Sequence, residues 1–131
     1  MNWKIILQLS IFGLIMAFGT VSLIPITIEP IFWLAIFVFS AYVIAKVCNE
    51  KYFLNGFCVC LVNCFWVISI HVLFAKAYTN NHLQVIGSMP GSLAIHPRLG
   101  MLATGPGFGV VSGLVLGSFS WIAAKFVKKA N

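Results

Sequence analysis

The chain has 131 residues, of which 61% are hydrophobic and only 8% are charged. Soluble domains carry about a quarter charged residues, so this composition leaves too little polar surface to cover a protein in water. The net charge of +6 does not indicate nucleic acid binding, because the basic residues lie at the ends of apolar runs and form no basic stripe with interleaved aromatic residues. The composition therefore predicts a single unit embedded in lipid.

Four segments are long and apolar enough to cross a bilayer, which requires about 20 apolar helical residues for a core of ~30 Å. We therefore predict an all-α integral membrane protein, a four-transmembrane-helix bundle. The predicted spans are residues 5–24, 30–47, 55–75 and 107–127. The second opens with Glu29-Pro30, an acidic residue and a proline typical of a helix start. A cleaved signal peptide is disfavoured for the first span, because its apolar core exceeds the usual ~7–15 residues.

The links between the spans differ in kind. The link "PITIEP" is so short that we expect the first two spans to form a tight antiparallel hairpin. Residues 76–106 are too apolar for a solvated linker and too broken by Pro and Gly for a full span, so we predict a loop or short helix packed on the bundle near the interface. As an alternative, the fourth helix begins at Pro97 and has a break or kink at Gly105-Pro106-Gly107.

The basic residues predict an orientation. Six lysines lie at the N-terminus, in the second link and at the C-terminus: Lys4, Lys46, Lys51, Lys125, Lys128 and Lys129. The first link has neither Lys nor Arg, and the third has Lys76 and Arg98. Because basic residues concentrate on the cytoplasmic side, both termini are expected in the cytoplasm, with loop 76–106 outside. We expect the chain to lie in a bacterial cytoplasmic (inner) membrane.

The last span contains glycines four residues apart, at Gly105, Gly109, Gly113 and Gly117. Such residues share one helix face and form a groove that lets a second helix approach closely, which is how helices associate in lipid. The first span has a second face of small residues, which includes Gly13 and Ala17 together with Ser10 and Thr20. The glycine face is therefore expected to pack on the first span or on a second copy of the chain, which would give a homo-oligomer through the last helix.

The few polar residues near or within the membrane are the candidate site residues, because such groups are costly there and often functional. They are Glu29, Asn63, His71, His96 and Arg98. Our sharpest hypothesis is a Glu29–Arg98 ion pair that closes an outer pocket with His71, His82 or His96. In the alternative, Glu29 caps its helix, Arg98 reaches lipid headgroups, and the span residues bond to neighbouring helices.

Cysteine chemistry and metal binding are not indicated. Cys48, Cys58, Cys60 and Cys64 form neither a disulfide framework nor a CxxC motif. Cys60, Cys64 and His71 share a helix face, but the first and last are more than about 10 Å apart along the axis and cannot bind one ion. We expect no metal and no cofactor.

These features favour a transporter or channel for a small solute or ion, with a site near the outer face. The alternative is a non-catalytic membrane subunit or a scaffold that interacts with lipids or a partner through the glycine face. An enzyme is disfavoured, because the sequence has no nucleophile arrangement, paired carboxylates or metal-ligand set. Membrane lipids are the expected partners. A wet cavity that reaches Asn63 or His71 would favour transport, and a dry bundle would favour the scaffold.

Overall fold

The computed structural model describes residues 1–127 and contains four long helices. Each of the four is long and apolar enough to cross a membrane, which marks a membrane-embedded protein. They are α1 (Trp3–Ser22), α2 (Glu29–Val47), α3 (Tyr52–Leu73) and α7 (Pro97–Phe126). Within the described residues all the regular structure is helical. The predicted all-α bundle is confirmed at this level.

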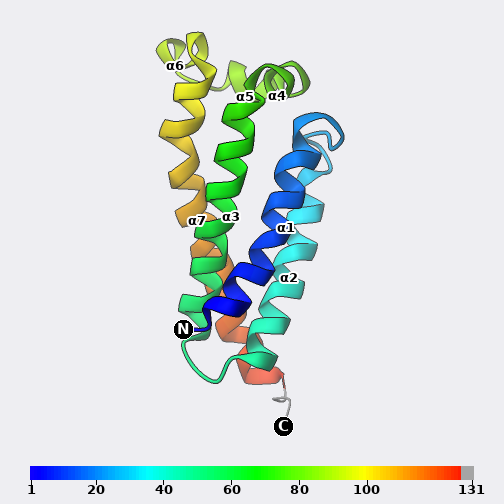
Figure 1. Ribbon diagram of the computed structural model, residues 1–131, viewed down its shortest axis with the longest axis vertical. Coiled ribbons are helices and arrows are strands. Elements are labelled where there is room, and N and C mark those ends of the chain that lie inside the picture. Colours follow the sequence, from blue (N-terminus) through cyan, green and yellow to red (C-terminus); the bar gives the residue numbers. More distant parts are fainter. Residues whose placement is uncertain (128–131) are drawn as a thin grey trace.

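The long helices pack around α3. In Figure 1, α1 and α3 run in the same direction, while α2 and α7 run in the opposite direction. Helix α3 packs most extensively on α7 and then on α1, and α2 packs mainly on α7. The first two spans form the expected antiparallel hairpin, and residues of both share one apolar cluster, but their backbones approach less closely than those of α1 and α3. The small residues of α1 face α3 instead, with Ala17 fully buried beside Ile70.

Three short helices lie at one end of the bundle, within the segment predicted as a loop. They are α4 (Ala75–Asn81), α5 (Leu83–Gly87) and α6 (Gly91–Ile95). We call this the cap end, and the opposite end, where the N-terminus lies, the terminal end (Figure 1). The Asn81 side-chain amide donates a 2.8 Å hydrogen bond to the Val21 carbonyl, which ties α4 to the end of α1.

Helix α7 begins at Pro97, ten residues before the predicted span at 107, and continues through Pro106 without a break. Of the two predicted starts the earlier one is correct, and the predicted break at Gly105–Gly107 is absent. Pro106 removes one backbone donor, a loss that membrane helices tolerate. Packing supports the helix here, because the Cys64 thiol on α3 lies 3.3 Å from the Gly105 carbonyl as a hydrogen-bond donor.

The glycine face of α7 is covered by α3. A Cβ atom at any of the four glycines would come within 2.9 Å of an α3 side chain, so these helices approach as closely as glycine allows. The pairs are Gly105 with Ile68, Gly109 with Cys64, Gly113 with Phe57, and Gly117 with Phe53. The predicted partner, α1, is wrong, because α3 has its own glycine, Gly56, against this face. Within the chain this face is therefore occupied and is not open to a second copy.

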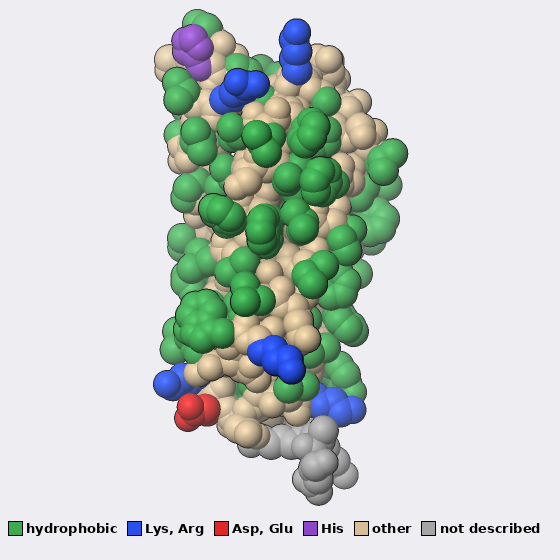
Figure 2. Space-filling view, viewed as in Figure 1, with side chains coloured by type: hydrophobic (Ala, Val, Ile, Leu, Met, Phe, Trp, Pro, Cys, Tyr) green, Lys and Arg blue, Asp and Glu red, His purple; other side chains and the backbone are tan. Residues whose placement is uncertain are grey.

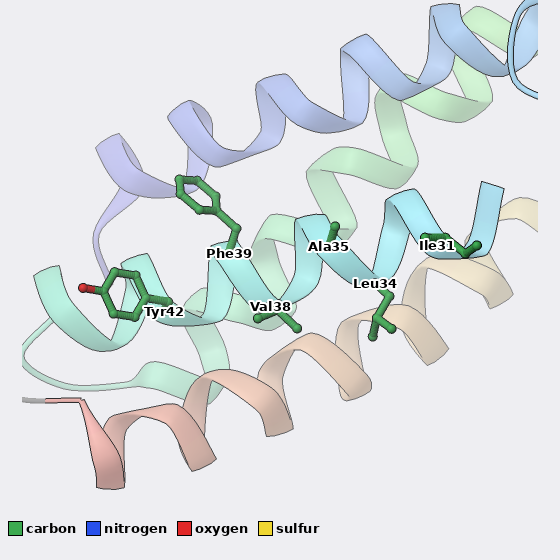
Figure 3. A pocket seen from close by; sticks show the side chains of 6 residues that line it. All are labelled: Ile31, Leu34, Ala35, Val38, Phe39 and Tyr42. Atoms are coloured by element: carbon green, nitrogen blue, oxygen red, sulfur yellow. The ribbon is translucent and has the colours of Figure 1, made fainter. Parts of the chain in front are cut away.

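The surface is apolar along its length and basic at its ends, as Figure 2 shows. By the elements that carry them, Lys4, Lys46, Lys51 and Lys125 lie at the terminal end. Lys128 and Lys129 are outside the described residues. Helix α2 has an exposed apolar face with a shallow hollow lined by Ile31, Leu34, Ala35, Val38, Phe39 and Tyr42 (Figure 3). Apolar side chains around the middle of the bundle are what a lipid environment requires.

Candidate functional site

The first part of the site is a hydrogen bond between α3 and α1 near the cap end. His71, in the last turn of α3, is buried, and its Nε2 atom lies 2.8 Å from Oγ1 of Thr20 on α1. The same hydroxyl lies 2.8 Å from the Met16 carbonyl. A hydroxyl has only one proton, so when it donates to this carbonyl the imidazole must carry its proton on Nε2. When the ring proton is on Nδ1, the hydroxyl turns to donate to Nε2.

The second part is a stack of three rings, which we call the ring column: His71, Tyr78 and His82. Tyr78 stacks on His71 with ring centroids 4.0 Å apart, and on His82 with centroids 4.4 Å apart. Two rings at these distances and near-parallel angles must lie on opposite faces of the tyrosine. Tyr78 lies on α4, and His82, the residue that caps its C-terminal end, follows four residues later on the same side of the helix. The turn at Phe74 brings this face onto the end of α3.

The third part is the end of the ring column at Glu29. His82 is buried with 1% exposure, and its Nδ1 atom lies 3.2 Å from the Tyr78 carbonyl. Its Nε2 atom has no hydrogen-bond partner and lies 3.9 Å from a Glu29 carboxylate oxygen. The other carboxylate oxygen accepts a 3.1 Å hydrogen bond from the Trp33 indole. When Nδ1 donates to the Tyr78 carbonyl, Nε2 and the carboxylate are two facing acceptors, and this arrangement can hold one added proton.

The Glu29 charge also acts on the middle ring. Burial and the nearby carboxylate raise the pKa of the Tyr78 hydroxyl to about 12, because both disfavour the phenolate. Tyr78 therefore stays neutral at physiological pH. The remaining groups of the ring column that can accept and donate a proton are its two imidazoles.

Polar residues continue from the ring column toward the terminal end, along the interface between α3 and α1. We call Asn55, Asn63 and His71 the polar seam, since each lies on α3 against α1 or the residue that caps its start, Asn2. The Asn55 side-chain carbonyl accepts a 2.9 Å hydrogen bond from the Asn2 backbone, and the side chain of Asn63 fills the space over Gly13. The three are eight residues apart along α3, so about 12 Å separates successive levels.

Asn63 is the unusual member of the polar seam. It is 3% exposed, and neither its amide nitrogen nor its amide oxygen has a hydrogen-bond partner. An unpaired amide in an apolar interior costs about 2–7 kcal/mol. The side chain is therefore an unused donor and acceptor in the middle of the bundle.

The predicted Glu29–Arg98 ion pair is wrong. Among residues 1–127, the carboxylate of Glu29 lies near His82, and no ion pair joins it to Arg98. Because α7 begins at Pro97, Arg98 is held in the first turn of that helix, where it lines a cap-end hollow with His96 and Lys76. The structure thus brings together Glu29, His71 and His82 and places His96 and Arg98 in a second group.

Sequence reasoning missed three members of the site, namely Thr20, Trp33 and Tyr78. A signal for Tyr78 was present, since it lies four residues before His82 and seven after His71. Trp33 likewise follows Glu29 by four residues, a spacing that brings the two side chains together on a helix. Within residues 1–127, no group of three His, Cys, Asp or Glu side chains is placed to hold a metal ion.

In comparisons with known proteins, the chain matches no family model, no curated protein and no solved structure. The function of the protein is therefore inferred from the geometry of this chain.

Proposed function

We propose that the protein is a small membrane transporter or channel that moves protons, alone or together with a small solute. The observation that carries this proposal is the unpaired Nε2 atom of buried His82, 3.9 Å from the Glu29 carboxylate and stacked through Tyr78 on His71. Two buried imidazoles and the partly exposed Glu29 carboxylate supply groups that can accept and release a proton.

The polar seam supplies the continuation of the path. His71 bonds to Thr20, and Asn63 lies about 12 Å farther along the same interface with its donor and acceptor unused. A proton does not cross such a distance between side chains directly, so transfer requires water between α1 and α3. Asn63 would bind that water, because its amide gains the partners it lacks in the dry bundle.

The orientation belongs to the same proposal. Four lysines lie at the terminal end and two basic residues at the cap end, which favours a cytoplasmic terminal end and an outward ring column. We place the protein in a bacterial cytoplasmic membrane on the same reasoning. A green fluorescent protein fused to the C-terminus should fluoresce, and an alkaline phosphatase fused there should be inactive.

Proton flux into liposomes tests the proposal. The full chain is reconstituted, a potassium gradient with valinomycin sets the voltage, and an internal pH dye reports uptake. His82→Gln should lower the rate about 100-fold or more, the scale on which a positioned proton-transfer group acts, and Asn63→Leu should lower it as well, because it removes the amide that binds the connecting water. His96→Gln is the matched control, because His96 is exposed at the same end and lies outside the ring column. Equal rates in wild type, His82→Gln and empty liposomes would refute the proposal.

A scaffold function is the second candidate, and α2 is the observation that favours it. The first half of α2 is largely exposed and apolar, and the buried residues of the helix, Ser40, Ala41, Ile44 and Ala45, all lie in its second half. Phe39 points toward α1, where its ring lies 5.6 Å from that of Phe12, while the rest of this face is open (Figure 3). A partner helix would cover it. Two results would support this function: the chain carries no proton flux, and it copurifies with one membrane protein. The Leu34→Asn variant should then no longer copurify with that protein.

A further inference from the structure

A hollow at the cap end combines positive charge with exposed apolar side chains. It lies between α4 and the start of α7 and has a volume of about 710 Å³. Lys76 comes from α4 and Arg98 from α7, so two separate elements each contribute a cation. Its lining also includes Thr79, Ile95, His96 and Leu99. The hollow is distinct from the ring column: Lys76 and Thr79 of α4 line the hollow, whereas Tyr78 of α4 stacks on His71 and His82.

The two cations have no acidic partner. The chain has two acidic residues, Glu29 and Glu50. Glu29 is engaged by Trp33 and lies beside His82, while Glu50 is in the link between α2 and α3 at the terminal end. Within residues 1–127, neither Lys76 nor Arg98 has a carboxylate within ion-pair distance. Two unneutralised charges therefore meet at one hollow, and they attract an anion.

The backbone of α7 adds to this charge. His96 precedes the helix without a side-chain cap, and the Gly100 amide bonds to the His96 carbonyl at 3.1 Å. Pro97 has no N–H group, so the amides of Arg98 and Leu99 are the first-turn donors without an intrahelical partner. Both residues line the hollow, at the positive end of a 30-residue helix. The helix end reinforces the attraction of the two side-chain cations.

The apolar part of the lining indicates where the anion comes from. Ile95 is 75% exposed and Leu99 is 56% exposed, directly beside the cations. A ligand with a negative group above an apolar chain satisfies both features. We infer that this hollow binds a phosphate group, and that its source is the headgroup of an anionic phospholipid. Lys76 and Arg98 supply charge, and Ile95 and Leu99 contact the start of the acyl chains.

Native mass spectrometry of the full chain in detergent tests this inference. The dissociation constant for dioleoyl phosphatidylglycerol is measured for wild type, for Lys76→Gln with Arg98→Gln, and for Lys4→Gln with Lys46→Gln. The control pair removes the same charge at the terminal end. The cap-end pair should weaken binding about fivefold for each charge removed, and the control should stay within about twofold of wild type. A second series adds inorganic phosphate, against chloride at equal ionic strength.

The outcomes separate the two sources of phosphate. Weaker lipid binding in the cap-end variant without competition by inorganic phosphate supports a headgroup site. Competition supports a phosphate site whose ligand is the free anion as well. Equal lipid affinity in the wild type and the cap-end variant overturns the inference, and so does an equal loss in the control, which would show attraction by net charge alone. If circular dichroism shows that the double variant is unfolded, Arg98→Gln alone carries the comparison.

Discussion

Replacing Gly56 by alanine tests the closest approach between helices in the bundle. Gly56 lies on α3, and a Cβ atom there would lie 2.8 Å from the Leu116 carbonyl oxygen and 3.0 Å from the Gly117 Cα atom. Both atoms belong to the backbone of α7, so no side-chain rotation relieves the contact. Ordinary contacts of a Cβ atom begin at 3.4 Å. The two helices must therefore separate by about 0.6 Å at this level, and the dispersion contacts beside it weaken.

The size of the effect follows from two opposing contributions. Overpacking of a close contact costs about 1–3 kcal/mol, while exchange of glycine for alanine inside a helix gains about 1 kcal/mol. Gly107 on α7 supplies the matched control, because a Cβ atom at that position meets nothing within 4 Å. Gly107→Ala should therefore raise the free energy of unfolding by up to about 1 kcal/mol. The difference between the two variants isolates the packing contribution, about 1–3 kcal/mol, since helix propensity changes equally in both.

The measurement is reversible unfolding in mixed micelles, followed by circular dichroism for the wild type, Gly56→Ala and Gly107→Ala. We expect the order Gly107→Ala, wild type, Gly56→Ala from most to least stable. If both variants gain the same stability, α3 and α7 are not held at the separation described here. Close packing along the whole glycine face would then be contradicted, because Gly56 makes the closest approach to the backbone of the facing helix.

Three further predictions concern single residues. Asn63→Leu should leave the free energy of unfolding unchanged or raise it by about 1–3 kcal/mol, because it removes an unpaired buried amide; a clear loss in the same micelle assay would mean that the amide has partners. The raised pKa of Tyr78 means that the folded state holds this proton more tightly than the unfolded state, so its stabilising contribution is complete below about pH 10 and is lost as pH rises toward about 12. Absorbance at the phenolate band should show one late-titrating tyrosine, absent in Tyr78→Phe, and an unchanged titration would contradict its burial beside Glu29. Pro106→Ala should raise the thermal midpoint, because it restores a backbone donor within a continuous helix; a lower midpoint would show that the proline shapes α7 for its packing on α3.

The spans could be predicted from the sequence because a mostly apolar composition indicates that the chain is surrounded by lipid. A run of about 20 apolar residues has few structures available in lipid other than a helix, so the four long helices follow directly. The start of α7 at Pro97 was harder to predict, because the helix must continue through Gly105-Pro106-Gly107, a sequence that breaks helices in water. In the bundle, close packing on α3 supports the helix across it. At this position, packing on α3 outweighs the low helix propensity of glycine and proline.

Pairings between distant segments could not be predicted in the same way. The small residues of α1 and α7 are visible in the sequence, but their periodicity does not say which helix meets them. The single glycine of α3, Gly56, was the available signal. The ring column was hidden for a different reason. The four-residue spacing of Tyr78 and His82 is readable, yet their contact with His71 depends on the turn at Phe74.

The two faces of α3 differ in what they allow. Toward α7 the helices meet through glycines and leave no space for a Cβ atom, so this interface can admit water only by coming apart. Toward α1 the interface carries Asn63, whose amide lacks partners, and His71, whose bond to Thr20 can reverse its direction. The free energy needed to hydrate this side is lower, because water supplies hydrogen bonds that the dry state leaves unmade. Under the proposed transport function, we expect a conducting state to form by movement of α1 against a fixed α3–α7 pair, with α4 following α1 through the bond between Asn81 and Val21. That movement would carry Tyr78 and His82 with it, and the ring column would open at its contact with His71.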